Sequence, residues 1–438
     1  MTTATNPASG NPIPTGPAAP SSRVVLAKAV VKNWKTPVAL GIIAVIGVVL
    51  FWILGRDGET TFSLSGSGDA IQLAPLVLPV RPTGIVVSIL LVLIAAYSTW
   101  LVYRARKVPL WLIIVFAILT VLAFLVWALA GATEPLAGLF IGTVGLSVPL
   151  IFGALGGVIS EHVGVVNVAI EGQLLAGAFL SAVVASMTGQ PLLGLIAAMV
   201  GGVLVSFVLA AFSIKYLVDQ VIVGVVLNVL VLGLTNFLYS EVLSPNAHAL
   251  NSPERFGRIK IPLLGDIPVI GPVLFQQTII VYLMYIAVFV VWYGLFHTKW
   301  GLRLRASGEH PQAADTVGIR VNLSRFWNVS LAGAIVGLGG AYFTLGSNGG
   351  FTKDVTGGYG FIALAAVIFG RWDPVRATLA ALLFGFATNL QSVFGVIGSP
   401  VPSEFLLMLP YIVTIFAVAG LVGQVKAPAA EGKPYVKS

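Results

Sequence analysis

The residues best suited to chemistry in this chain lie inside long apolar stretches. In the run 164–179, Asn167 and Glu171 are four residues apart and share one face of a helix. Gln173 lies just beyond them. An ionisable group in hydrocarbon is costly, about 2.5–3.5 kcal/mol on insertion scales for Asp, Lys or Arg. Glu171 is therefore expected to face inward, either on a translocation path or as a carboxyl that satisfies backbone N–H groups freed where Gly172 breaks the helix.

Further amide and aromatic side chains occur in other apolar runs, and taken singly each amide is more simply explained as an interhelical hydrogen bond. Asn228 and Asn236 are eight residues apart and lie on roughly the same side of one helix. If all these groups converged on one cavity, they would suit a neutral polar solute with a ring that can stack. The residues of this hypothetical substrate path are Asn167, Glu171, Gln173, Phe179, Asn228, Asn236, Tyr342, Phe343, Asn389 and Gln391.

Several motifs of catalysis are missing from the sequence. It contains no GxxxxGK[ST], HExxH or GxSxG pattern, and no carboxylate pair within one apolar run. It has no cysteine and only four scattered histidines, so we expect neither a disulfide nor a metal site. We therefore expect a protein that is not an enzyme, uses no cofactor and hydrolyses no ATP itself.

The composition is that of a polytopic membrane protein. Of 438 residues, 57% are hydrophobic and 9% charged, whereas soluble domains are about 25% charged. The sequence predicts an all-α bundle of about twelve spans, of which 358–370 is short and the region 164–172 is a candidate for a broken or re-entrant helix. The expected spans are 37–54, 83–103, 109–131, 137–158, 165–188, 192–214, 221–243, 276–296, 326–346, 358–370, 375–397 and 404–424.

The basic residues predict the orientation of these spans. When the spans alternate from a cytoplasmic N-terminus, 18 of the 24 Lys and Arg residues fall on the cytoplasmic side and 6 on the other. We expect both termini in the cytoplasm and the chain in the plasma or inner membrane. The expected parts are a disordered tail 1–36, accessory helices 37–135, a core 136–426 and a cytoplasmic tail 427–438.

The polar interruption 299–325 is the largest basic loop. Pro311 suits the first position of a short helix over 312–317, and Gly318 suits its C-terminal cap. Such a helix on the cytoplasmic face is either a solvated connector or a contact for a partner. On the opposite side, the loops 244–275 and 347–356 are expected either to receive a binding protein or to act as passive connectors.

Four segments in a fixed order carry a resemblance. GVVNVAIEGQLLAGAF (164–179), DQVIVGVVLNVLVLGLTNFLYS (219–240), GLRLRASGEHPQAADTVGI (301–319) and GFIALAAVIFGRWDPVRATLAALLFGFATNLQ (360–391) resemble the ABC-importer permeases of the branched-chain amino acid, simple-sugar and nucleoside group, most of all the nucleoside type linked to basic-membrane-protein lipoproteins. The resemblance spans about 136–425. The first three spans extend beyond it, and the core has nine full crossings where about ten are expected.

The resemblance implies a type II ABC-importer core that works with partners. These are a cytoplasmic ABC ATPase, a second related permease, a substrate-binding lipoprotein and a small-molecule substrate, with no role for nucleic acid. It implies that the short helix docks into the ATPase. The implied coupling residues are Arg303, Arg305, Glu309, Pro311, Gln312, Ala313, Ala314, Asp315, Val317 and Gly318. The alternatives are a simple-sugar permease, a self-sufficient secondary carrier and a purely structural subunit.

Overall fold

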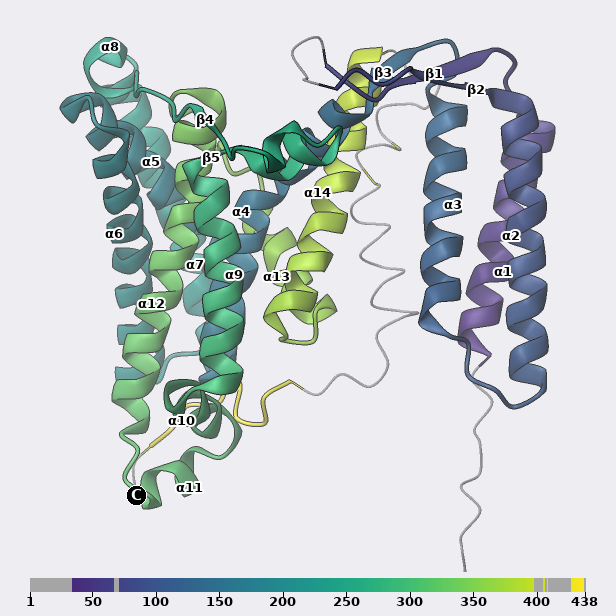
Figure 1. The fold of residues 1–438 in the computed structure, drawn as a ribbon. Helices are drawn as coiled ribbons and strands as arrows, with labels where there is room; N and C mark the ends of the chain where they lie inside the picture. Colours follow the sequence, from purple (N-terminus) through teal and green to yellow (C-terminus); the bar gives the residue numbers. More distant parts are fainter. Residues whose placement is uncertain (1–33, 67–70, 398–404, 406–407, 409–426, 437–438) are drawn as a thin grey trace, which may run out of the picture.

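The computed structural model describes residues 34–66, 71–397, 405, 408 and 427–436 (Figure 1). Within them are ten helices long and apolar enough to cross a membrane. They are α1 with its π-helical extension η1 (Lys35–Val48, Val49–Ile53), α2 (Val80–Tyr103), α3 (Leu110–Ala128), α4 (Leu136–His162), α5 (Ile170–Thr188), α6 with η2 (Pro191–Ala210, Ala211–Lys215), α7 with η3 (Gln220–Leu238, Tyr239–Leu243), α9 (Ile279–His297), α12 with η6 (Val321–Ala341, Tyr342–Asn348) and α14 (Pro374–Ile397).

The shorter elements lie between these helices. They are α8 (Ala247–Leu250), η4 (Leu264–Asp266), η5 (Gly271–Phe275), α10 (Lys299–Glu309), α11 (Pro311–Thr316) and α13 (Tyr359–Phe369). The eleven residues of α13 extend about 16 Å, roughly half of the 30 Å hydrocarbon layer. The run 358–370 is therefore helical but too short to cross alone, while the expected span 404–424 lies almost entirely outside the described residues.

Local sequence signals account for several helix ends. Gly189, in the left-handed region at φ 65°, ends α5, and Pro191 at the first position begins α6. The Asp219 side chain accepts hydrogen bonds from the first amides of α7. The helix α5 is shorter than the expected span 165–188. It starts only at Ile170, because 163–169 is a buried non-helical connection.

The core is built around α4, α5, α6 and α12, whose interfaces are rich in small residues. A methyl group at Gly202 of α6 would overlap the carbonyl of Gly333 in α12, and one at Gly337 would overlap the carbonyl of Ala198. The two backbones are therefore in direct contact, as small residues at four-residue spacing allow. The GxxxG pair at 333 and 337 forms this contact.

Two small sheets lie on the face opposite α11 (Figure 1). In the first, β1 (Glu59–Ser63) runs antiparallel to β2 (Leu76–Pro79), with Glu59 opposite Pro79, and parallel to β3 (Thr133–Pro135), with Thr61 opposite Thr133. In the second, β4 (Arg258–Lys260) pairs antiparallel with β5 (Gln276–Thr278). These short strands lie in the connections between helices, so the fold remains predominantly helical.

The helices α1–α3 form a bundle beside the core, at the right of Figure 1. They pack on one another through a separate apolar cluster that includes Leu40, Leu91 and Phe116. A second cluster joins the end of α3 to the core, where Leu129 meets Leu139 of α4 and Phe394 of α14. The bundle therefore has its own apolar interior and a narrow junction with the core.

The long helices run between two faces of the molecule, whereas the predicted crossing 358–370 ends between them (Figure 1). The α2–α3 connection, α10 and α11, and the described segment 427–436 lie at the bottom of Figure 1, and the strands lie at the top. The basic α2–α3 connection, α10, α11 and 427–436 therefore share one face.

Candidate functional site

The non-helical connection 163–169 is held by buried amide side chains. Asn167 and Gln173 exchange hydrogen bonds of 3.1 and 3.2 Å, and Gln173 also donates to Ser206 of α6 at 3.0 Å. All three are fully buried. These side chains therefore satisfy one another around the start of α5, as buried polar groups must.

Asn228 of α7 completes this arrangement. Its side-chain oxygen accepts from the amide of Gly172 at 2.8 Å, and its nitrogen donates to the carbonyl of Val168 at 2.8 Å. The neighbouring amide of Val166 donates to Gln220 at 2.7 Å. Sequence reasoning missed Gln220, and its place directly after the Asp219 cap gave no sign of a contact so distant in the chain.

Glu171 extends from the first turn of α5 to the beginning of α13 and is 8% exposed. One carboxyl oxygen accepts from the Thr356 hydroxyl at 2.6 Å and the Gly358 amide at 2.9 Å, and the other accepts from the Gly360 amide at 2.5 Å. The carboxyl thus meets the N-terminal end of a helix, where negative charge is favoured.

This geometry corrects the expected helix break. The helix α5 continues through Gly172, so the break lies upstream at 163–169. The backbone N–H groups that Glu171 satisfies belong to the start of α13 and not to its own helix. Gly357 and Gly358, with φ of 47° and 87°, turn the chain into α13, and this glycine pair is the sequence signal that marks the site.

The other predicted path residues contact separate partners. Asn389 donates to the Leu139 carbonyl at 2.7 Å and joins α14 to α4. Phe179 packs edge-on against Phe351, and Phe343 against Tyr359, with ring centroids 5.3 and 5.4 Å apart.

Three path residues remain, and all three are half-buried. Tyr342 points its hydroxyl at Gly145 of α4. The buried side-chain oxygen of Asn236 has no hydrogen-bond partner among the described residues. Gln391 lies near the described end of α14. The structure therefore gathers Asn167, Gln173 and Asn228 around the start of α5 and leaves the others on different interfaces.

The basic segment 299–325 is more ordered than a loop. Thr298 caps α10 by accepting from the Gly301 amide, and the close approach of Gly301 to the carbonyls of Gly294 and Leu295 folds α10 against α9. Pro311 occupies the first turn of α11, as predicted. The expectation of a single short helix in a loop was therefore incomplete, because 299–309 is helical as well.

The helix α11 has one anchored side and one free side. Ala314 is buried, whereas Gln312, Ala313 and Thr316 are exposed, and Val317, directly after the helix, is 76% exposed. Gly318 follows at φ 86° and turns the chain toward α12.

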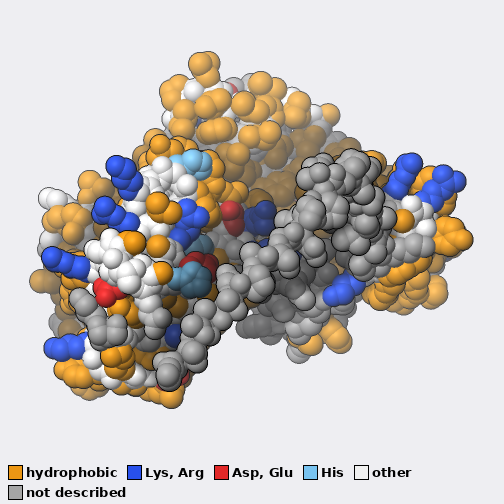
Figure 2. All heavy atoms as spheres, turned by 90° about the horizontal axis from the view of Figure 1, so that it is seen from below, with side chains coloured by type: hydrophobic (Ala, Val, Ile, Leu, Met, Phe, Trp, Pro, Cys, Tyr) orange, Lys and Arg blue, Asp and Glu red, His pale blue; other side chains and the backbone are white. Residues whose placement is uncertain are grey.

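The charged residues of this segment have different surroundings. The Arg305 guanidinium lies 5.2 Å from the Phe296 ring, and the Glu309 carboxyl accepts from the Ala429 amide at 3.2 Å. Arg325 is only 1% exposed and donates to the Lys433 carbonyl at 2.9 Å. Arg303, Asp315 and Arg320 lie nearer the surface, and Figure 2 shows Lys and Arg side chains gathered on this face.

The segment 427–436 packs onto α10 and α11, which the sequence did not predict. The Ala430 amide donates to the Gly308 carbonyl at 2.9 Å. Tyr435, 8% exposed, packs with Ala314 of α11 and Val321 of α12. The expected cytoplasmic tail is thus, in its described part, a brace that joins α10, α11 and α12.

A carboxyl group of this brace is half-buried against the core. Glu431 lies against Glu161 near the end of α4, and Glu161 also accepts a hydrogen bond from the Trp372 indole. Burial raises the pKa of Glu431 to about 7, and its hydrogen bond with Glu161 opposes the shift.

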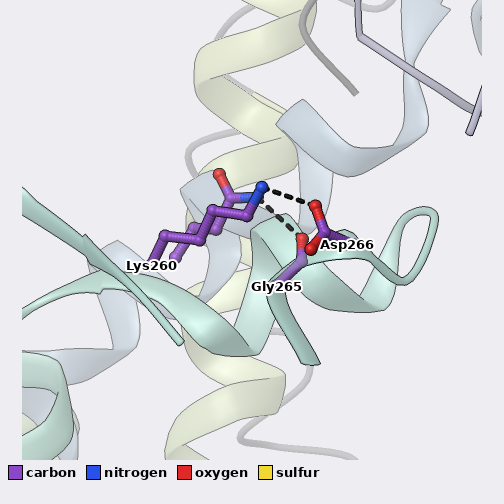
Figure 3. A network of polar contacts seen from close by, with 4 residues as sticks. Lys260, Gly265 and Asp266 are labelled. Carbon is purple, nitrogen blue, oxygen red and sulfur yellow. Dashed lines mark hydrogen bonds and ion pairs between the residues drawn. The ribbon is translucent and has the colours of Figure 1, made fainter. Parts of the chain in front are cut away.

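On the opposite face the two predicted loops contact each other. Asn251 accepts from the Phe351 amide at 2.6 Å and donates to its carbonyl at 2.9 Å. Within the first loop, Lys260 and Asp266 form an ion pair of 2.5 Å beside Gly265 (Figure 3). The loops 244–275 and 347–356 thus form one ordered surface. Their role in receiving a binding protein remains a prediction.

Comparison with known proteins places this architecture in a family. Residues 139–418 match the family described as "Branched-chain amino acid transport system / permease component". The guanosine ABC transporter permease protein NupQ of Bacillus subtilis is 43% identical over 304 residues, which cover 67% of this chain and 95% of the relative. The nucleoside ABC transporter permease protein NupC of Lactococcus lactis is 42% identical over 67% of this chain and 94% of its own length.

A relative of lower identity is named for glucose and not for a nucleoside. The putative glucose ABC transporter permease protein TsgC13 of Haloferax volcanii is 36% identical over 58% of this chain and 77% of its own length. No solved structure matches the chain. Because the family match covers well over half of its length, the chain belongs to the family of permease components of branched-chain amino acid transport systems.

Proposed function

We propose that this chain is a membrane permease subunit of an ATP-driven importer of nucleosides, with α11 on the cytoplasmic face as the contact for the ATPase. The names of the two relatives at 42–43% identity support the substrate class. The observation that carries the coupling role is α11 itself, a short helix with an exposed tip and a base packed on α12.

The coupling mechanism follows from how α11 is anchored. Through Ala314, Val321 and Tyr435 it packs on the start of α12 and on the brace 427–436. Since α12 packs against α4, α5 and α6, a displacement of α11 by a closing ATPase dimer is transmitted to the centre of the core. The chain supplies this lever, and ATP hydrolysis takes place in the partner.

On the substrate side, the permease works with a second related permease, and a binding lipoprotein delivers the solute to the face of loops 244–275 and 347–356. The basic residues near α10, α11 and 427–436 support a cytoplasmic location for that face and for both termini in the cell membrane. The helices α1–α3 form an accessory unit before the core. The half-buried Asn236, Tyr342 and Gln391 have the polar and aromatic groups that a nucleoside path requires.

Uptake by proteoliposomes tests this function. We expect radiolabelled guanosine to accumulate only when the permease is reconstituted with its ATPase, second permease and binding protein, and only with ATP. Glucose in place of guanosine tests the simple-sugar alternative. Gradient-driven uptake by this chain alone would establish a self-sufficient carrier and refute the proposal.

A replacement of α11 tests the coupling role. When residues 312–317 are exchanged for a Gly/Ser segment of equal length, we expect normal membrane insertion, continued ATP hydrolysis by the complex and loss of uptake. The matched control exchanges residues 105–107 in the α2–α3 connection on the same face. Coupled uptake at the wild-type rate after the α11 exchange would contradict the coupling role.

A further inference from the structure

A cavity of about 670 Å³ lies beside the coupling helix. Its walls come from α10, from the connection 317–320 that links α11 to α12, and from the first three turns of α12. The residues predicted to couple ATP hydrolysis include only part of this lining. None of the predicted substrate-path residues lines the cavity.

One end of the cavity is cationic. Arg303 extends from α10, and Arg320 comes directly before α12. Both are exposed, and among the described residues neither guanidinium group has a hydrogen-bond or ion-pair partner, while the backbone carbonyls accept from Ser307 and Ser324. Ser324, also in the lining, accepts a hydrogen bond from Asn328 at 3.3 Å, which leaves its hydroxyl hydrogen available for a ligand.

The other end is apolar and continues along the outer side of α12. Leu323, Trp327 and Leu331 line it at four-residue spacing, and Trp327 is 59% exposed. These residues belong to a membrane-length helix, so their exposed side faces hydrocarbon. A soluble anion would use only the cationic end and would leave this apolar wall without a partner.

Trp300 forms a fixed wall between the two ends. Its indole nitrogen donates to Asn328 at 2.9 Å, and its ring packs against Gly294 of α9. Tryptophan is enriched where headgroups meet hydrocarbon, and Arg residues near that level attract anionic lipids. The cavity therefore combines a charged end at the level of the headgroups with an apolar strip at the level of acyl chains.

We propose that this cavity binds one anionic phospholipid, with its phosphate between Arg303 and Arg320 and an acyl chain along Leu323, Trp327 and Leu331. The bound lipid fills the space beneath the connection 317–320. It therefore supports the position of α11 relative to α12. This inference needs only membrane insertion and does not depend on the identity of the transported solute.

Lipid binding to the full-length chain in detergent tests the proposal without any ATPase. We expect native mass spectrometry to detect one retained phosphatidylglycerol and much weaker retention of phosphatidylcholine with the same acyl chains. In the double variant Arg303→Gln/Arg320→Gln we expect retention of phosphatidylglycerol to fall at least about tenfold. The matched control Arg106→Gln/Lys107→Gln removes the same charge from the same face and should stay within about twofold of wild type.

Two further measurements separate the sources of the anion. Glycerol 3-phosphate, which lacks acyl chains, should not displace the lipid at equal concentration, and Trp327→Ser should weaken lipid retention. Equal retention of both lipids, equal losses in the two double variants, or displacement by glycerol 3-phosphate would each overturn the proposal. Unchanged melting of every variant is the condition for comparing them.

Discussion

The contact between Glu171 and the start of α13 allows a quantitative prediction. Glu171→Leu removes the acceptors for the Thr356 hydroxyl and for the amides of Gly358 and Gly360. The Thr356 and Gly360 donors are buried and the Gly358 amide is partly buried, and a buried unsatisfied donor is costly. We therefore expect the variant to insert into the membrane but to lose the fixed start of α13.

The magnitude follows from the hydrogen bonds. Each bond to a charged acceptor contributes about 1.5–3 kcal/mol, but three donors on one carboxyl are not additive. We expect Glu171→Leu to lower the free energy of unfolding by roughly 3–5 kcal/mol. In Glu171→Gln one side-chain oxygen still accepts hydrogen bonds, whereas the new NH₂ group is itself a donor and faces other donors. We therefore expect this variant to lose about half as much free energy of unfolding as Glu171→Leu.

The assay is thermal unfolding of purified protein in detergent, followed by the fluorescence of its nine tryptophans. Apparent midpoints are compared at one heating rate, because unfolding of such proteins is often irreversible. Hydrogen exchange of residues 349–369 gives the local measurement, and we expect faster exchange there in Glu171→Leu. The control Glu254→Leu changes an exposed carboxyl for which the described structure gives no hydrogen bond.

An unchanged midpoint together with unchanged exchange at 349–369 would refute the reasoning. A transport assay separates the two roles foreseen from the sequence. If Glu171 acts mainly as a contact for solute, Glu171→Gln should abolish uptake at nearly full stability. If it acts mainly on α13, uptake and stability should fall together.

Three further predictions concern the brace and the core. Tyr435→Ala should loosen α11 and reduce uptake several-fold at unchanged membrane insertion, because about 2–4 kcal/mol of aromatic packing is lost. Uptake by reconstituted complexes measures this effect, and uptake by the variant at the wild-type rate would contradict it. Because the pKa of Glu431 is raised to about 7, we expect docking of the brace to be fully stabilised below the ordinary pKa of Glu and to weaken as pH rises through about 7. Glu431 is partly exposed, so we expect a loss of only about 1–2 kcal/mol in docking free energy. The loss should appear as faster hydrogen exchange at 427–436 after correction for intrinsic rates, and protection independent of pH between 5 and 8 would contradict it. Gly333→Leu should prevent the contact of α12 with Gly202 and abolish accumulation of folded protein in size-exclusion chromatography, whereas Gly233→Leu, at a glycine with open space, should not.

Much of the membrane topology could be predicted from sequence, because the spans are long apolar runs separated by charged loops. The start of α11 at Pro311 and its end before Gly318 followed from turn and cap preferences that act within a few residues. The helix α10 was missed because its basic composition resembles a loop, while its formation depends on the close packing of Gly301 against the end of α9.

The site was less predictable because its contacts join residues far apart in the chain. The pairing of Glu171 with Gly358 and Gly360 crosses nearly two hundred positions, and nothing near Glu171 indicates which amides it meets. The brace was taken for a tail, because a short polar segment has no apolar periodicity and is held by single residues such as Tyr435. The amides at 167, 173 and 228 were among the ten residues of the hypothetical substrate path, but the sequence could not show that 167 and 173 bond each other while 228 bonds the backbone beside them.

The backbone contact between α6 and α12 limits how this protein can change shape. A methyl group at Gly202 would meet the Gly333 carbonyl, and one at Gly333 would meet the Ser206 side chain and the Gly202 carbonyl, so the two helices leave little room to slide past each other. We therefore expect these two helices to move together. Bending has to occur where regular geometry is lost, and in α12 that point is the π-helical turn η6, where the chain leaves the pair for the face of the outer loops.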